Sequence, residues 1–208
     1  MARSTAVVAL LALTGALVWG CSHPTNHEIP PDLPYPLRSS PDSLMAQLAW
    51  AYEDMSLGVY LDCFADSFVF YLSEEEVEEN PELEPGYWRK AVEETIHAGM
   101  FGGSAVSADS IRLALTTTEI DTVSVPDGRG RGTGWEYREA VFLRLYVGDT
   151  EYWATKPSVF VIRQDPDDVG PNGQTLYEIW EWRELDDGKC GGRQAVMRSW
   201  GALKALYR

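Results

Sequence analysis

Apolar residues recur at helical spacing between residues 40 and 64. Ser40 can cap a helix there, and Pro41 suits its first turn, where a missing N–H costs nothing. The apolar stripe of this first predicted helix consists of Leu44, Leu48, Ala51, Tyr52 and Met55. Gly58 interrupts the run, and a second, shorter stripe consists of Leu57, Tyr60, Leu61 and Phe64. The spacing therefore predicts two consecutive helices.

The next two segments predict a strand and a third helix. Residues 67–72 are apolar on both parities, which is typical of a strand covered on both faces. Residues 86–100 return to helical spacing, with Trp88, Ala91, Val92, Thr95, Ile96 and Gly99 on one face. The opposite face carries Arg89, Lys90, Glu93, Glu94 and His97. We therefore expect His97 to face water and to be a poor candidate for a general base.

From residue 111 onward the period changes from 3.6 to 2. Alternating apolar residues predict strands within 111–115, 135–147, 159–163 and 176–185. Turn residues separate them at 127–134, 148–149 and 166–173. Helices followed by an antiparallel run indicate an α+β fold, with a strongly curved antiparallel sheet wrapped on three N-terminal helices.

The first twenty residues predict export. Arg3 precedes an apolar run over residues 6–18, which is too short to span a bilayer and suits a secretory signal peptide. The run ends Leu-Val-Trp-Gly-Cys at residues 17–21, which resembles the lipobox of bacterial lipoproteins. The resemblance implies that Cys21 carries the lipid and anchors the protein to the bacterial cell envelope. Ser22 would direct it to the outer membrane under the enterobacterial sorting rule. An ordinary signal peptide is the alternative.

The mature chain divides into a tether, a domain and a tail. Residues 21–40 are rich in proline and form the tether, which also carries His23 and His27. Residues 41–187 have the size of one domain, and the tail at 188–208 has five basic residues and no acidic one. We expect this tail to pack on the acidic domain, with a partner or membrane contact as the alternative. The formal net charge of −15 argues against nucleic-acid binding.

Two cysteines and an acidic run are candidates for a disulfide and for a metal site. Cys63 and Cys190 are the thiols left once Cys21 is acylated, and an oxidising compartment would let them pair. The alternative is that Cys63 is a small hydrophobic residue beside an apolar stripe. The glutamate-rich run at 74–84 reads as a solvated loop or a frayed helix and lacks the pattern of a calcium loop. No metal or cofactor is predicted.

Four short segments resemble the nuclear transport factor 2-like superfamily, which includes ketosteroid isomerases and SnoaL-like polyketide cyclases. They are Ala-Tyr-Glu-Asp at 51–54, Tyr-Leu-Asp-Cys-Phe at 60–64, Phe-Val-Phe at 68–70 and Trp-Glu-Trp-Arg-Glu at 180–184. The resemblance covers residues 41–187 and implies a cone-shaped sheet with an apolar pocket. We place that pocket near Tyr60, Phe70, Trp88 and Trp182. The superfamily contains both enzymes and binding domains, so the resemblance does not carry function.

The catalytic carboxylate of isomerase-like members has no counterpart in residues 67–72. The remaining acid–base candidates are Glu139, Glu181 and Asp62, with Asp66 nearby. A cavity position would raise the pKa of Glu139 or Glu181, whereas pairing with an arginine such as Arg144 or Arg163 would make either one structural.

Two functions therefore stay open. The first is a non-catalytic domain that binds an apolar small molecule or a protein, and a homodimer is compatible with it. The second is a periplasmic isomerase, dehydratase or cyclase that uses a pocket carboxylate. The sequence favours the first. It also predicts that the Pro-Tyr-Pro segment at 34–36 covers Trp50, which lies away from the first apolar stripe; a subunit contact and an exposed tryptophan are the alternatives.

Overall fold

The computed structural model describes residues 35–102, 108–126, 131–171, 173–186 and 204. Its helices are α1 (Pro41–Glu53), α2 (Leu57–Asp62), α3 (Glu74–Glu79), the 3-10 turn η1 (Pro81–Leu83) and α4 (Lys90–Phe101). α1 begins as predicted: the Ser40 hydroxyl accepts the Ser43 N–H at 3.1 Å, and the Ser43 hydroxyl accepts the Ser40 N–H at 2.8 Å. The glutamate-rich run forms α3 and η1. No described helix is long and apolar enough to cross a bilayer.

The strands are β1 (Phe64–Tyr71), β2 (Tyr87–Arg89), β3 (Ser110–Pro126), β4 (Arg131–Val147), β5 (Thr150–Val169) and β6 (Thr175–Glu184). They form one sheet in the order β2-β1-β6-β5-β4-β3. Every pair is antiparallel except β1 and β6, which run parallel. The α+β class is confirmed, and the sheet is antiparallel apart from this pair.

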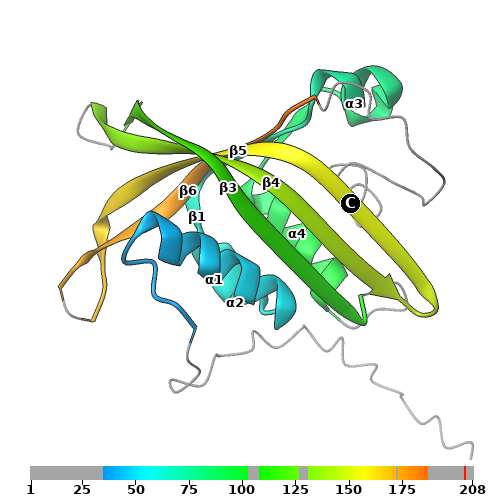
Figure 1. Cartoon of the computed structure of the whole chain (residues 1–208), viewed down its shortest axis with the longest axis horizontal. Coiled ribbons are helices and arrows are strands. Elements are labelled where there is room, and N and C mark those ends of the chain that lie inside the picture. The colour runs from blue at the N-terminus through cyan, green and yellow to red at the C-terminus, as the bar shows by residue number, and fades with distance from the viewer. Residues whose placement is uncertain (1–34, 103–107, 127–130, 172, 187–203, 205–208) are drawn as a thin grey trace, which may run out of the picture.

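The helices cover one side of the curved sheet. α1 packs against β3 and β6, while α4 packs against β1 and α2. Figure 1 shows the long strands β3, β4 and β5 crossing the molecule, with α1 and α2 far from α3. A continuous apolar core lies between the two layers and includes Leu48, Tyr52, Phe68, Phe70, Ile96, Leu143, Phe160 and Trp182. Close strand packing needs a glycine at Gly134, where a Cβ would lie 2.7 Å from the Val125 side chain.

Several strand predictions need correction. β1 begins at Phe64, which we assigned to a helix, and it is covered on one face only: Phe68 and Phe70 are buried, but Tyr71 is exposed. The helix predicted over 86–100 begins only at Lys90, because residues 87–89 form β2, a strand too short to show a period. β5 runs through the predicted turn and ends at Val169, so the turn begins at Gly170. The turn at 148–149 is confirmed.

The end of the tether lies on α1. The rings of Tyr35 and Trp50 are 5.3 Å apart between centroids, so the contact predicted for the 34–36 segment is confirmed at Tyr35. Cys21, most of the tether and the tail apart from Lys204 lie outside the described residues.

Candidate functional site

α4 turns two ionisable residues into the core. Glu93, Ile96, His97 and Met100 are buried and occupy positions i, i+3, i+4 and i+7 of the helix. The prediction that His97 faces water is therefore wrong. The buried stripe contains polar as well as apolar residues, and the partners of the polar ones come from distant segments. A prediction based on apolar spacing alone therefore assigned the wrong face of the helix to the core.

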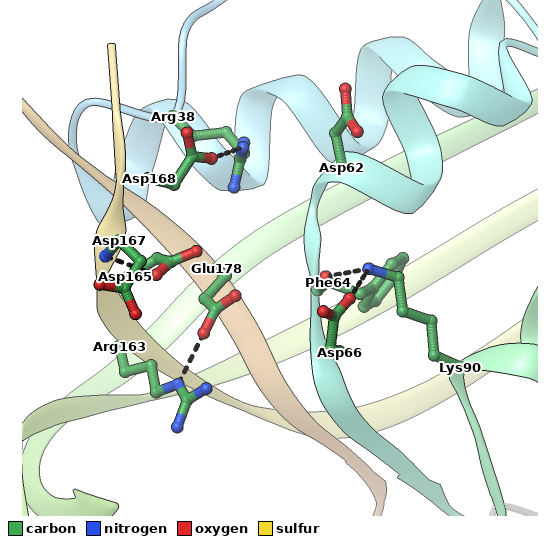
Figure 2. Close-up of a pocket in the computed structure, with 10 residues that line it drawn as sticks. All are labelled: Arg38, Asp62, Phe64, Asp66, Lys90, Arg163, Asp165, Asp167, Asp168 and Glu178. Atoms are coloured by element: carbon green, nitrogen blue, oxygen red, sulfur yellow. Dashed lines mark hydrogen bonds and ion pairs between the residues drawn. The ribbon is translucent and has the colours of Figure 1, made fainter. Parts of the chain in front are cut away.

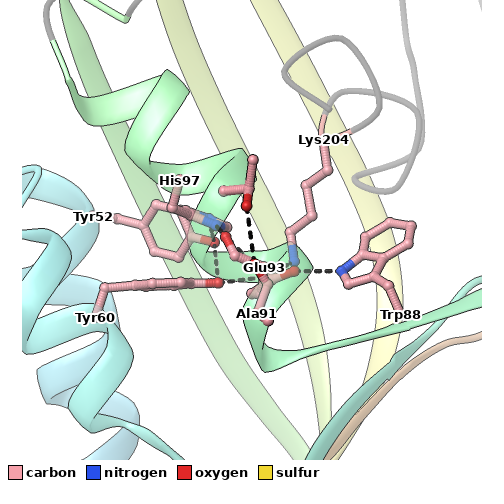
Figure 3. A network of polar contacts seen from close by, with 8 residues as sticks. Tyr52, Tyr60, Trp88, Ala91, Glu93, His97 and Lys204 are labelled. Carbon is pink, nitrogen blue, oxygen red and sulfur yellow. Dashed lines mark hydrogen bonds and ion pairs between the residues drawn. The ribbon is translucent and has the colours of Figure 1, made fainter.

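The Glu93 carboxylate is surrounded by hydrogen-bond donors (Figure 3). Oε1 accepts the Tyr60 hydroxyl at 2.5 Å and the Lys204 ammonium, and Oε2 accepts the Trp88 indole N–H at 2.5 Å. Burial opposes ionisation of Glu93, but the charge of Lys204, the proximity of His97 and the donated hydrogen bonds outweigh it and lower the pKa. Glu93 is therefore an ionised carboxylate in the core.

His97 is held as a neutral imidazole. Its Nδ1 lies 3.0 Å from the Glu93 carbonyl oxygen, and its Nε2 lies 2.8 Å from the Tyr52 hydroxyl. A carbonyl only accepts, so Nδ1 carries the proton and Nε2 accepts from Tyr52. Burial, assisted by the charge of Lys204, lowers the pKa of His97 to about 3 against the attraction of Glu93. The Tyr60 ring stacks on the imidazole at 3.9 Å between centroids.

Lys204 reaches Glu93 from the C-terminal tail. Its side chain is fully buried, and its Nζ lies 3.9 Å from the ring centroid of Phe70, 4.5 Å from that of Trp182 and 5.7 Å from that of Trp88. These three rings and the Glu93 carboxylate surround the ammonium. Burial lowers the pKa of Lys204, whereas Glu93 raises it.

The predicted pocket residues meet at this place. Tyr60, Phe70, Trp88 and Trp182 are each at most 3% exposed and line the Glu93–Lys204 pair. The sequence analysis grouped these four aromatic residues but did not place Glu93, His97 and Lys204 beside them. A helical stripe of Glu and His at i and i+4 was the one local signal for the first two. Nothing local connects Lys204 to residues more than a hundred positions earlier.

The acid–base candidates lie elsewhere, each in a different setting. Glu181 accepts the Arg183 guanidinium at 2.7 Å, so the arginine-pairing alternative holds for it. Asp62 ends α2 at the mouth of a charged cleft. Glu139 accepts the Thr117 hydroxyl at 2.7 Å, and an arginine partner for it is absent from the part of the chain that the structure describes.

Glu139 lines a groove of about 450 Å³ between α1 and β3. It is 2% exposed, and its Oε2 atom has no hydrogen-bond partner among the described residues. Burial raises the pKa of Glu139, against the lowering effect of the Thr117 hydrogen bond. The other lining residues include Asp42, Met45, Ala46, Ala49, Leu113 and Leu115. A carboxyl of this kind can hold a proton that an ordinary glutamate would have lost.

The charged cleft measures about 380 Å³ and joins α2, β1, β5 and β6 (Figure 2). Its charges are largely paired: Arg38 with Asp168 at 2.5 Å, Arg163 with Glu178 at 2.7 Å, and Lys90 with Asp66 at 3.2 Å. Within the described ranges, no group of three or more His, Cys, Asp or Glu residues could hold a metal ion. The cleft is a network of ion pairs on the surface.

Cys63 carries a free thiol. It is fully buried and donates to the Val59 carbonyl oxygen at 3.3 Å, and burial raises its pKa. The predicted partner, Cys190, lies outside the described residues. The environment of Cys63 favours the small hydrophobic role.

A curved sheet with helices packed against it is the α+β arrangement that the resemblance to the nuclear transport factor 2-like superfamily implies. No protein-family model matches the chain, and no curated protein matches it. The beta subunit of benzoate 1,2-dioxygenase from Burkholderia mallei is similar at 13% identity and a TM-score of 0.48, over 69% of this chain and 86% of that one.

Two further solved structures are similar. A putative calcium/calmodulin-dependent protein kinase type II association domain from Thiobacillus denitrificans has 14% identity and a TM-score of 0.45, over 72% of this chain and 97% of that one. A nuclear transport factor 2-like protein of unknown function in nutrient uptake from Rhodospirillum rubrum has 13% identity and a TM-score of 0.42, over 68% and 93%. At such scores these likenesses say nothing of ligand or activity for this chain.

Proposed function

We propose that this chain is a lipid-anchored protein of the bacterial cell envelope whose domain binds a ligand or partner and catalyses no reaction. The observation that carries the non-catalytic part is the state of Glu93. Its carboxylate already accepts three donors, from Tyr60, Trp88 and Lys204. A general base needs a lone pair within reach of a substrate proton, and this one is engaged by the protein itself.

His97 supports the same proposal. Its Nδ1 proton is directed at a backbone carbonyl, and its Nε2 lone pair accepts from Tyr52. A catalytic histidine works best when its pKa lies near the working pH, and the pKa of His97 is about 3. The interior polar groups therefore stabilise the fold.

The anchor is proposed from residues 17–21 and fits the position of the domain. Thirteen residues, 22–34, separate Cys21 from Tyr35, which contacts α1. A polyproline-II segment of that length spans about 40 Å, at roughly 3.1 Å per residue. The domain would then stand clear of the headgroups while acyl chains on Cys21 hold it to the membrane.

Two measurements test the proposal. Mass spectrometry of the mature N-terminus should find an acylated Cys21, and a cut elsewhere or an unmodified Cys21 would refute the anchor. NMR titration of histidine-labelled protein should show His97 neutral down to pH 4, with free imidazole, which titrates near pH 6.5, as the external reference. Titration of His97 between pH 5 and 8 would contradict the non-catalytic role.

One observation favours an enzyme as the second candidate. Glu139 is a buried carboxyl with a raised pKa and an unpartnered oxygen beside a groove. An isomerase-type reaction would use it to remove a proton next to a carbonyl group. The test is deuterium exchange of a panel of ketones in D₂O, followed by proton NMR. Exchange by the native protein that Glu139→Gln abolishes would favour this candidate over the binding domain.

A further inference from the structure

We propose that Glu93 and the rings of Phe70, Trp88 and Trp182 form a binding site for a primary alkylammonium group, which the chain's own Lys204 occupies in this structure. The inference rests on the proposed binding function and names the ligand class of its interior site. Figure 3 shows the Lys204 side chain with its ammonium beside the Glu93 carboxylate, which also accepts from Trp88.

The walls have the chemistry that recognises an ammonium. Nζ of Lys204 lies within 6 Å of three ring centroids, the range in which a cation is attracted to an aromatic face. Phe70 and Trp88 stack nearly parallel, 4.6 Å apart and 11° between planes, and Trp182 closes the cage edge-on to Phe70. The site combines aromatic ring faces with one carboxylate, and each of these two features attracts a cation.

The site requires a cation because Glu93 is fully buried. A buried ionised carboxylate left without a counter-charge is strongly unfavourable, since Tyr60 and Trp88 donate hydrogen bonds but carry no charge. A neutral ligand of the same shape would leave that charge uncompensated. Binding of an amine should therefore depend on Glu93 more than on any ring.

Two features restrict the ligand to primary amines. The ammonium donates an N–H to Glu93 Oε1, which a quaternary nitrogen cannot do. Its nitrogen also lies 3.9 Å from the Phe70 centroid, which leaves no room for a methyl group on that side. The alkyl stem is unbranched, as in lysine itself.

The occupant and the walls belong to different parts of the chain. The walls lie on β1, β2, β6 and α4, which the sheet and the core hold in place. Lys204 lies twenty residues beyond Glu184, the last residue of β6. Withdrawal of that side chain would leave a site whose walls are still held, so a second ammonium can compete for it.

The competition can be measured in the unaltered full-length protein. The chain has four lysines, at 90, 156, 189 and 204. With [6-¹³C]lysine labelling, the chemical shift of the Lys204 Cε should differ from that of a free lysine because of the surrounding aromatic rings. Titration with n-butylammonium should move it saturably to the position of a free lysine. Lys156, which is also buried and donates to Ser73 at 2.9 Å, is the matched control and should not move.

A variant provides the second arm. Lys204→Ala should show a saturable rise in melting temperature with n-butylammonium, and with Nα-acetyl-lysine amide if protein lysines also enter the site. Glu93→Gln/Lys204→Ala, n-butanol and butyltrimethylammonium should each give no rise beyond that of matched sodium chloride. A Lys204 signal that never moves, or an equal rise with n-butanol, overturns the inference. Such a failure with His97 still neutral would leave the non-catalytic proposal standing.

Discussion

The coupling between Glu93 and Lys204 gives the sharpest energetic prediction. Both side chains are fully buried, and their charged groups are in direct contact. Removing one member of such a pair leaves an isolated charge in the core and costs about 3–5 kcal/mol. We therefore expect Lys204→Met and Glu93→Gln each to lower the free energy of unfolding by about that amount.

The double variant Glu93→Gln/Lys204→Met removes both charges at once. Its side chains keep nearly the same volume. The glutamine oxygen can still accept from Tyr60, whereas the glutamine NH₂ group cannot accept from the Trp88 indole N–H. It should therefore be more stable than the sum of the single changes predicts, with a coupling energy of about 2–3 kcal/mol. Urea denaturation followed by tryptophan fluorescence measures all four proteins of the cycle.

The control cycle replaces Lys204→Met by Lys156→Met. Lys156 is buried and hydrogen-bonds Ser73, but no described contact joins it to Glu93. Its effect should add to that of Glu93→Gln within about 0.5 kcal/mol. Equal, additive behaviour in both cycles would refute the reasoning, because it would mean that the Lys204 ammonium and the Glu93 carboxylate do not interact.

Three further predictions concern Glu139, Cys63 and the Tyr35–Trp50 contact. Burial raises the pKa of Glu139, so the native protein keeps this proton above the pH of about 4.3 at which the unfolded chain loses it. Stability should therefore fall as pH rises above about 4.3, and Glu139→Gln should gain stability relative to wild type over that rise in urea titrations. Iodoacetamide should label the Cys63 peptide only after unfolding, and native labelling at the rate of glutathione would contradict its burial. Tyr35→Ala should red-shift the emission of Trp50, and a shift that persists in a Trp50→Phe background would contradict the contact.

Local signals predicted the helices and the main strands. Each of these signals is local in the sequence: the Ser40 cap, the apolar stripe from Leu44 to Tyr52 and the period-2 runs. β2 was missed because three residues carry no period. The β1–β6 pair was missed because a parallel neighbour leaves no turn between the strands to reveal it.

The site was predicted only in its apolar part. Aromatic residues indicate an apolar core, so the sequence could place Phe70, Trp88 and Trp182 in the interior. That they line a ligand pocket stays a prediction. Glu93 and His97 read as surface residues because isolated charge is expensive to bury. Their burial depends on Lys204, whose position more than a hundred residues away is a property of the tertiary structure.

The parallel pairing of β1 with β6 also sets the order in which the domain can fold. β6 lies between β1 and β5, and its residue Trp182 pairs with Phe70. Until residues 175–184 have been synthesised, β1 lacks its inner neighbour and the sheet consists of two separate pieces. Contacts of such high sequence separation slow folding, because the intervening loop must close first. A chain truncated before Thr175 would expose two strand edges and the aromatic face of β1, and it would aggregate rather than fold.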